Sequence, residues 1–563
     1  MCEKLNTAEK HKKYIDFYLD KDSESSCLTL TVCHCKLGLI GTGMNMCYCC
    51  QQCLTGTGAH PCCERGLTGV SPCCERGLTW AHPCCEEYWG IGIENESYMM
   101  TEKMEDVGRD FLLNNTKRER YSIDYFLNYK MDEYKKTVSS IKNVTVPYYI
   151  NSYMFQNMDI YGENRTLYTK GIKMNTKFCG MTIHEYMKYM SKKYTKLFDK
   201  NVIFDGDTIE FTTNKFYKTT VNNVMNELNT IKHVFLREVN KYLANKFVFS
   251  GYGSEISYPS HNYGFVKYMT NKNNIGICNS GTYHINITLP TTLSLNGMKI
   301  KNPSAFKNTH QNAIHFIQWV EPLIVALYGT PDILSCAAKD GSYCHGSLRL
   351  MMSRYIGLGT YDTDTMEPGK KLNDFDYKSD ASHYFNKLHD ADSPYNPPET
   401  IGYDFNYNKF KNHGIELRIL DYFPEEYLTD VINFIILVCQ HSVYNNITCE
   451  RKPQNSKLWN DFVISCIRQG SEAVVSNEMY LCLREIFGMD VDAGCCREVF
   501  SLFRKNKNRT VMKVITKISD FLYDKYRQDT IVGKMSPLMK KMVWVDYNKI
   551  MKEKYTSAIH MRM

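Results

Sequence analysis

A short segment near residue 90 places two carboxylates where they could bind a cation together. In WGIGIENESYM, Ile91 and Ile93 face one way, whereas Glu94 and Glu96 share the other face of the expected strand. This period of two is typical of a half-buried strand. The polar side of this strand is therefore a candidate source of oxygen ligands for a metal ion.

Three later segments show the same alternation. The segments VIFDGDTIEFTT, GTYHINITLP and GIELRIL each have the period of two that predicts a half-buried strand. Their polar faces carry Glu210, His284 and the pair formed by Glu416 and Arg418. The four strands together thus offer four carboxylates, one imidazole and one guanidinium.

One such strand alone needs no function, because a half-buried antiparallel strand normally shows its polar face to water. The set is unusual because the chain has abundant Lys, Asn and Thr for that purpose. If the strands are neighbours, their glutamates repel one another unless a cation lies between them. Oxygen ligands with one imidazole suit Mg²⁺ or Mn²⁺, with phosphate oxygens completing the shell. Arg418, two residues after Glu416, would add donors for a phosphoryl group in transfer.

A second basic segment is GSYCHGSLRLMMSRYIGLGTYDT, which carries Arg349 and Arg354 before Gly357, Gly359 and Thr360. Arginines on a helix are most often surface residues. Next to a metal and phosphate site, these two become candidates for binding phosphates or a substrate carboxylate.

The elements that must position these residues indicate an α+β protein. We expect a curved, mainly antiparallel sheet whose concave polar face is the active site, with helices on its outer face. The segment NTHQNAIHFIQWVEPLIVALYG predicts a core helix bent near Pro322, in which His310 and His315 are packed or capping residues. Further helices are expected over Asn455–Gly470, Asn477–Met489, Arg509–Tyr526 and Met535–Met551. The basic residues Arg504, Lys505, Lys507 and Arg509 predict a solvated loop, with phosphate binding the minority interpretation.

Composition sets the limits of the domain organisation. The chain has 563 residues, 43% hydrophobic and 23% charged, which suffices for two or three domains and excludes a mini-protein or a disordered tail. Of its 24 cysteines, 14 precede residue 90, where HPCCERGLTGV, SPCCERGLTWA and HPCCEEYW form an 11-residue repeat. We expect a Cys-rich, low-complexity segment over 1–87, a catalytic domain over 88–450 and a helical extension over 451–563. The repeat could bind metal or form strained disulfides, or it could be a low-complexity expansion that packs against nothing.

The same composition bears on targeting and partners. The N-terminus is charged throughout and makes a poor signal peptide. The apolar runs Ala313–Tyr328 and Val431–Val438 are too short or too polar to span a membrane. We expect a soluble, intracellular, cytoplasmic protein with its scattered thiols reduced. The net charge of +7 is too dilute over this length to argue for nucleic acid.

These motifs, in their order along the chain, resemble the carboxylate–amine ligases of the glutamine synthetase and glutamate–cysteine ligase fold, including amidoligase-like proteins of large DNA viruses. The resemblance rests on GIENE, RERYSIDYF (118–126), DGDTIEFTT, NSGTYHINITLP, AIHFIQWVEPLIVALYG and GIELR, and it covers about residues 88–440. If the protein is viral, the resemblance places it in the host cytoplasm or the virion.

The resemblance implies an ATP-dependent ligase that forms an amide or peptide bond through an acyl phosphate, with glutamate as one possible carboxylate substrate. Two or more divalent cations, Mg²⁺ or Mn²⁺, would be bound by Glu94, Glu96, Glu210, His284 and Glu416. Arg418 would contact the transferred phosphate, and Arg349 or Arg354 would bind other phosphates or the amino acid. Asp205 or Asp207 could supply a further acidic ligand.

Two other functions stay open. A guanidino or amine kinase of the same fold would transfer phosphate without forming an amide. A non-catalytic scaffold would keep the fold and bind metal or a partner through its Cys-rich arm. We expect small amino-acid or amine substrates, no nucleic acid and no membrane, and an oligomer is possible.

Overall fold

The strands that carry the polar residues pair with one another in a single antiparallel sheet. A computed structural model of the chain describes residues 87–108, 143–163, 165, 178–206, 208–214, 221–246, 255–258, 281–292, 300, 302–330, 346–355, 357–369, 372, 404–407, 409, 413–444, 452–489 and 509–526. The six-stranded sheet runs in the order β10 (Phe405–Tyr407), β11 (Ile415–Asp421), β7 (Thr282–Thr292), β1 (Glu87–Ser97), β5 (Thr208–Thr212) and β4 (Val202–Asp205). Each neighbouring pair is antiparallel. The expected α+β class with a mainly antiparallel sheet is confirmed.

The register of these strands brings the expected ligands opposite one another. Glu94 of β1 lies opposite His284 of β7, and Glu96 lies opposite Glu210 of β5. Glu416 of β11 lies opposite Asn286 of β7. Because directly opposed residues project to the same side of a sheet, the polar side chains of the four strands share one face.

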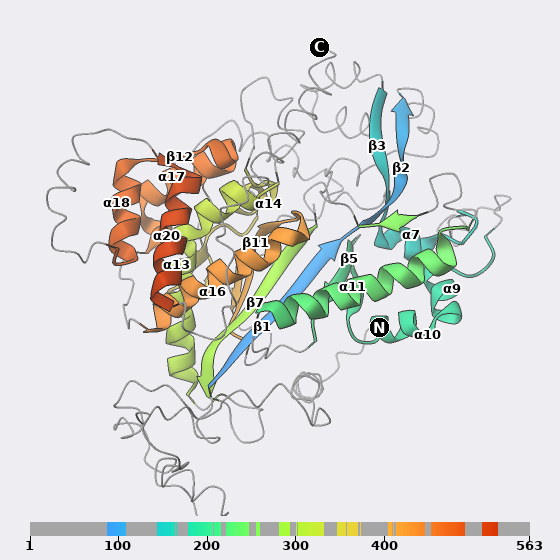
Figure 1. Ribbon diagram of the computed structural model, residues 1–563, viewed down its shortest axis with the longest axis horizontal. Coiled ribbons are helices and arrows are strands. Elements are labelled where there is room, and N and C mark those ends of the chain that lie inside the picture. Colours follow the sequence, from blue (N-terminus) through green and yellow to red (C-terminus); the bar gives the residue numbers. More distant parts are fainter. Residues whose placement is uncertain are drawn as a thin grey trace, which may run out of the picture.

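The other face of the sheet is apolar and is covered by helices. Ile93, Phe211, Ile285 and Leu417 are buried there in one hydrophobic core. The covering helices are α11 (Val221–Leu243), which packs on β1 and β5, and α13 (Pro303–Tyr328) and α16 (Leu428–Tyr444), which pack on β7. Figure 1 shows the long strands β1 and β7 side by side, with α11 and α16 crossing them. The helices thus fix which side of each strand remains for the polar residues.

Helix α13 is the central element of the helical layer. Asn302 caps its first turn by accepting from the Ala305 amide at 3.0 Å, and Pro303 stands at the first helical position, where its missing N–H costs nothing. Pro322 lies inside the helix. The two histidines are buried as expected: His310 bonds to the Leu289 amide at 2.9 Å, and His315 bonds to the Thr363 hydroxyl.

The C-terminal helices pack directly on this layer. They are α17 (Lys457–Gln469), α18 (Asn477–Ile486) and α20 (Val511–Tyr526), and they match three of the expected helices to within two or three residues. Trp459 of α17 donates to the Gln318 carbonyl of α13 at 2.9 Å, and His441 of α16 bonds to the Tyr526 hydroxyl at 3.0 Å. These helices therefore share the hydrophobic core of the sheet. The expected helix 535–551 and the basic residues 504–507 lie outside the described residues.

Smaller elements complete the described chain. A second sheet has the order β3 (Asn143–Ile150), β2 (Met99–Gly108) and β6 (Ile256–Ser257), and β2 follows β1 after Tyr98. The remaining elements are α7 (Ser152–Asn157), α9 (Ile183–Met190), α10 (Lys192–Phe198), α14 (Leu348–Tyr355), β8 (Tyr361–Asp362), β9 (Glu367–Pro368), β12 (Val474–Val475), β13 (Arg509–Thr510) and the 3-10 turns η6 (Glu425–Tyr427), η7 (Pro453–Asn455) and η8 (Gly470–Glu472). None of the described helices has the length and apolar character needed to cross a membrane.

The described cysteines are free thiols. Cys439 and Cys466 are buried, Cys482 is half-buried and Cys179 is exposed. Burial raises the pKa of the Cys439 and Cys466 thiols, so both stay protonated and unreactive at neutral pH. The Cys-rich repeat before residue 87 and the motif RERYSIDYF lie outside the described residues.

One close contact between sheet and helix gives a stability prediction. A Cβ added at Gly414 would overlap the His310 ring, so Gly414→Ala must displace the ring that bonds to Leu289. We expect a loss of about 1–3 kcal/mol in the free energy of unfolding, measured by chemical denaturation. In a double-mutant cycle, His310→Ala should relieve the clash and make the two losses less than additive. Additive losses would contradict this account.

Candidate metal centre

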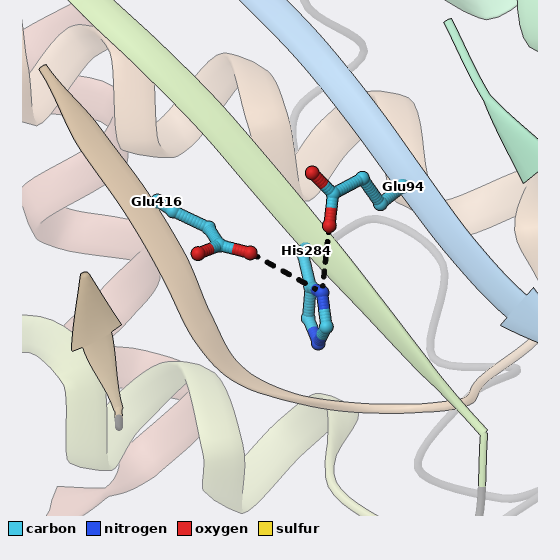
Figure 2. A group of neighbouring side chains, drawn as sticks. All are labelled: Glu94, His284 and Glu416. Carbon is cyan, nitrogen blue, oxygen red and sulfur yellow. Dashed lines mark hydrogen bonds and ion pairs between the residues drawn. The ribbon is translucent and has the colours of Figure 1, made fainter. Parts of the chain in front are cut away.

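Three side chains from three neighbouring strands converge in the first of two acidic groups. The imidazole Nδ1 of His284 lies 3.1 Å from Glu94 Oε2 and 3.5 Å from Glu416 Oε1. Figure 2 shows the ring between the two carboxylates, with β1, β7 and β11 each supplying one residue. All three side chains are buried. The register described above is the cause, because Glu94 faces His284 directly across the β1–β7 pair.

The hydrogen bonds of His284 indicate a neutral ring. Its Nε2 lies 3.2 Å from Arg349 Nη2, which can only donate, so Nε2 accepts and Nδ1 carries the proton toward Glu94. Burial lowers the pKa of His284 well below its usual 6.5, and the charges of Arg418 and Arg349 lower it further. A neutral imidazole binds a metal ion through its unprotonated nitrogen, so Nδ1 becomes a ligand when the ring proton moves to Nε2.

A second acidic group lies beside the first. One carboxylate oxygen each of Glu96, Asp205 and Glu210 lies within 4.8 Å of the others. Glu96 and Glu210 are buried, and Asp205 at the end of β4 is exposed. Burial raises the pKa of Glu210 to about 9, and the nearby carboxylates of Glu94, Glu96 and Asp205 add to the effect. The group therefore needs a proton or a cation to balance its charge.

The two groups adjoin one another and fit divalent cations. His284 Nε2 lies 3.7 Å from Glu96 Oε1, which joins the groups across β1 and β7. Three carboxylates suit a hard ion such as Mg²⁺ or Mn²⁺, and two carboxylates with an imidazole suit Mn²⁺ as well. All five expected ligands thus lie together, and Asp205 joins them. Asp207 lies outside the described residues.

Two of the three candidate arginines border the first group. Arg418 Nη1 lies 2.9 Å from Glu416 Oε1. Its Nε is buried and has no hydrogen-bond partner among the described residues. Arg349 reaches His284 through Nη2 and the Arg418 carbonyl through Nε, while its amide donates to Asp421 at 3.0 Å. Both guanidinium groups are thus held beside the carboxylates.

The third candidate, Arg354, lies in a different environment. It is fully buried and forms ion pairs with Glu321 of α13 and, at 2.6 Å, with Asp404 Oδ2 beside β10. It also donates to the Thr360 hydroxyl and lies 5.3 Å from the Trp459 ring. The Asp404 carbonyl accepts from the Arg418 amide at 2.7 Å. Arg354 therefore supports the strand that carries Arg418. Its ion pairs are with Glu321 and Asp404 and not with the expected metal ligands.

Sequence reasoning missed three polar residues of the first group. Asn286 Nδ2 lies 3.2 Å from Glu94 Oε1, and Asn406 Nδ2 lies 2.9 Å from Glu416 Oε2. Lys409 Nζ lies 2.7 Å from Glu416 Oε1 and 3.2 Å from Glu94 Oε2. The alternation of β7 already places Asn286 on the polar face. Lys409 follows β10 in a run of Asn and Lys, where nothing in the sequence distinguishes it from Lys411.

The excess of buried carboxylates predicts that divalent cations stabilise the fold. An ion that binds only the folded chain should add about 2.7 kcal/mol to the free energy of unfolding at a concentration 100 times its Kd. Thermal unfolding should be measured once with Mn²⁺ and once with a chelator, and the midpoint temperature should be higher with Mn²⁺. Glu210→Gln should reduce the difference, whereas equal midpoints in both solutions would contradict a cation site.

The position of Arg354 gives a separate stability prediction. Arg354→Met leaves Glu321 and Asp404 buried without their cation, so the free energy of unfolding should fall by about 3–5 kcal/mol. Lys457→Met, which removes an exposed ion pair with Asp461, is the matched control and should change stability little. Chemical denaturation measures both. Unchanged stability together with lost nucleotide binding would instead place Arg354 at the phosphates.

Comparisons with known proteins complete the description. No model of a known protein family matches the chain. Over 475 residues, 83% of this chain and 80% of the relative, the sequence is 41% identical to "Uncharacterized protein R704" of Acanthamoeba polyphaga mimivirus. At this identity and coverage, the chain belongs to the same family as the mimivirus protein.

Proposed function

We propose that the chain is an ATP-dependent carboxylate–amine ligase with the catalytic fold of glutamine synthetase and glutamate–cysteine ligase. One observation carries the proposal: the five residues expected as ligands, taken from four strands, lie together on one face of an antiparallel sheet. Two arginines stand beside them. A water-facing sheet surface has no reason to bury four glutamates against one another.

Divalent cations would be held by Glu94, His284 and Glu416 on one side and by Glu96, Asp205 and Glu210 on the other. When bound, they would supply Lewis-acid stabilisation of negative charge on the ATP phosphates. The protein itself would keep the carboxylates in place. Asn286 donates to Glu94 and Asn406 donates to Glu416, and the other lone pairs of these carboxylates are available to a cation.

A carboxylate is a poor electrophile, so joining it to an amine requires activation. In the proposed reaction ATP phosphorylates the carboxylate, and the amine then displaces phosphate from the acyl phosphate. Arg418 is suited to the transferred phosphoryl group because its buried Nε has a free donor among the described residues. Arg349, held by Asp421 and the Arg418 carbonyl, supports the same region with a second positive charge.

The domain boundaries of the proposal follow the sequence analysis. We propose that residues 88–450 contain the ligase site, that 1–87 are an addition to it, and that 451–563 are a helical extension whose described helices share its core. The relative in a mimivirus fits the resemblance to amidoligase-like proteins of large DNA viruses, and we propose a viral origin for this chain too.

An assay of the full chain tests the activity. With ATP, Mg²⁺ and candidate amino acids, beginning with glutamate, we expect ADP release and an amide product identified by mass spectrometry. Hydroxylamine in place of the amine should trap the acyl phosphate as a hydroxamate. Arg418→Met and Glu416→Gln should each lower the rate by about 10²–10³-fold, the first because it removes a donor at the phosphoryl group, the second because it removes a ligand of the cation that would stabilise that group.

The same assay separates the alternatives. Lys457→Met, on the exposed side of α17, is the control and should keep the parental rate. ADP release with a phosphorylated amine, and no amide, would identify a kinase. Folded Arg418→Met and Glu416→Gln chains that bind Mg²⁺ and ATP as the parent does would favour the non-catalytic scaffold.

A further inference from the structure

The two acidic groups differ in the positive charge that the chain itself supplies. In the first group, Glu416 contacts both Lys409 and Arg418, and Glu94 contacts Lys409. In the second group, neither Asp205 nor Glu210 forms an ion pair with a lysine or arginine among the described residues. The first group thus has a lysine and an arginine against its carboxylates, whereas Asp205 and Glu210 of the second group have neither among the described residues.

The Lys409 ammonium contacts the very oxygens that a metal ion would use. Glu94 Oε2 and Glu416 Oε1 are the atoms nearest to His284 Nδ1, at 3.1 and 3.5 Å. The same two atoms lie 3.2 and 2.7 Å from Lys409 Nζ. The three candidate ligand atoms of the first group therefore surround a position that lies next to the Lys409 ammonium. Coulomb repulsion would oppose a divalent ion there while Lys409 remains.

The Lys409 side chain lies at the rim of the first group. It extends from the connection between β10 and β11, and 30% of the side chain is exposed, whereas Glu94 and Glu416 are buried. An ammonium at such a rim can move into water without opening the core. The backbone of Glu94 and Glu416, in contrast, is fixed by strand pairing on β7.

We propose that Lys409 is the resident cation of the Glu94–His284–Glu416 group, so that the two cation positions of the site are unequal. Without nucleotide, the chain binds one divalent cation, at Glu96, Asp205 and Glu210. A second ion binds to the first group only when Lys409 has left it. This inference rests on the proposed function only in that both groups are taken as cation sites.

Equilibrium binding of Mn²⁺, measured without nucleotide by the electron paramagnetic resonance of the free ion, tests the proposal. The parent chain should bind about one ion tightly. Lys409→Met should bind two, with the affinity for the second ion at least about tenfold higher than in the parent, because a positive charge next to the site is gone. Lys409→Arg keeps the charge and should again bind one. Lys452→Met, which removes a lysine paired with Asp364, is the matched control and should match the parent.

Further variants locate each ion. Glu210→Gln in the parent should remove the tight ion, and Glu416→Gln added to Lys409→Met should return the count to one. Thermal unfolding confirms that each variant is folded. Two equal ions in the parent, unchanged by Lys409→Met, would overturn the proposal, as would no binding in any variant.

The outcome is distinguishable from that of the ligase assay. Two ions in the parent would remove the role of Lys409 and leave the ligase reaction untouched. A change from one ion to two in Lys409→Met, combined with no ADP release under any condition, would uphold Lys409 and overturn the ligase.

Discussion

The arrangement of the molecule depends on one electrostatic constraint: several buried carboxylates on one face of a sheet must be balanced by positive charge. The two-residue period of the strands fixes the register of the sheet. A slip of one residue would turn Glu94 and Glu416 into the apolar core beneath the helices. Charge is therefore brought to the carboxylates from other elements. Arg418 comes from the same sheet, Arg349 from α14 and Lys409 from the rim.

A second layer of buried charge holds this first layer in place. Arg354 joins Glu321 of α13 to Asp404, and the Asp404 carbonyl in turn holds the Arg418 amide. Asp421, whose pKa is raised to about 6 by burial, accepts from Ser347 and from the Arg349 amide. The backbone amides of Arg349 and Arg418 are thus both held. Their guanidinium groups are oriented by contacts with the Arg418 carbonyl and with Glu416, without help from a ligand.

The alternation of residues was enough to predict the sheet and its polar face, because each strand buries one side. It could not distinguish Arg349 from Arg354. Five residues apart on a helix, they point in directions about 140° apart, so one reaches His284 and the other Glu321. Lys409 could not be predicted for a different reason. It lies outside any periodic element, and only the pairing of β10 with β11 brings it to Glu416. Asp205 was one of two candidates that the spacing left equal.

Helix α13 has buried residues on every side from Ala313 to Tyr328, because the sheet covers one side and α17 and α20 cover another. The Trp459 indole donates a hydrogen bond to the Gln318 carbonyl, which lies within the helix that packs on the sheet. The C-terminal helices and the sheet are therefore parts of one folding unit. A chain without them would leave apolar residues of α13 in water, and the same helix supports the sheet whose opposite face carries the carboxylates.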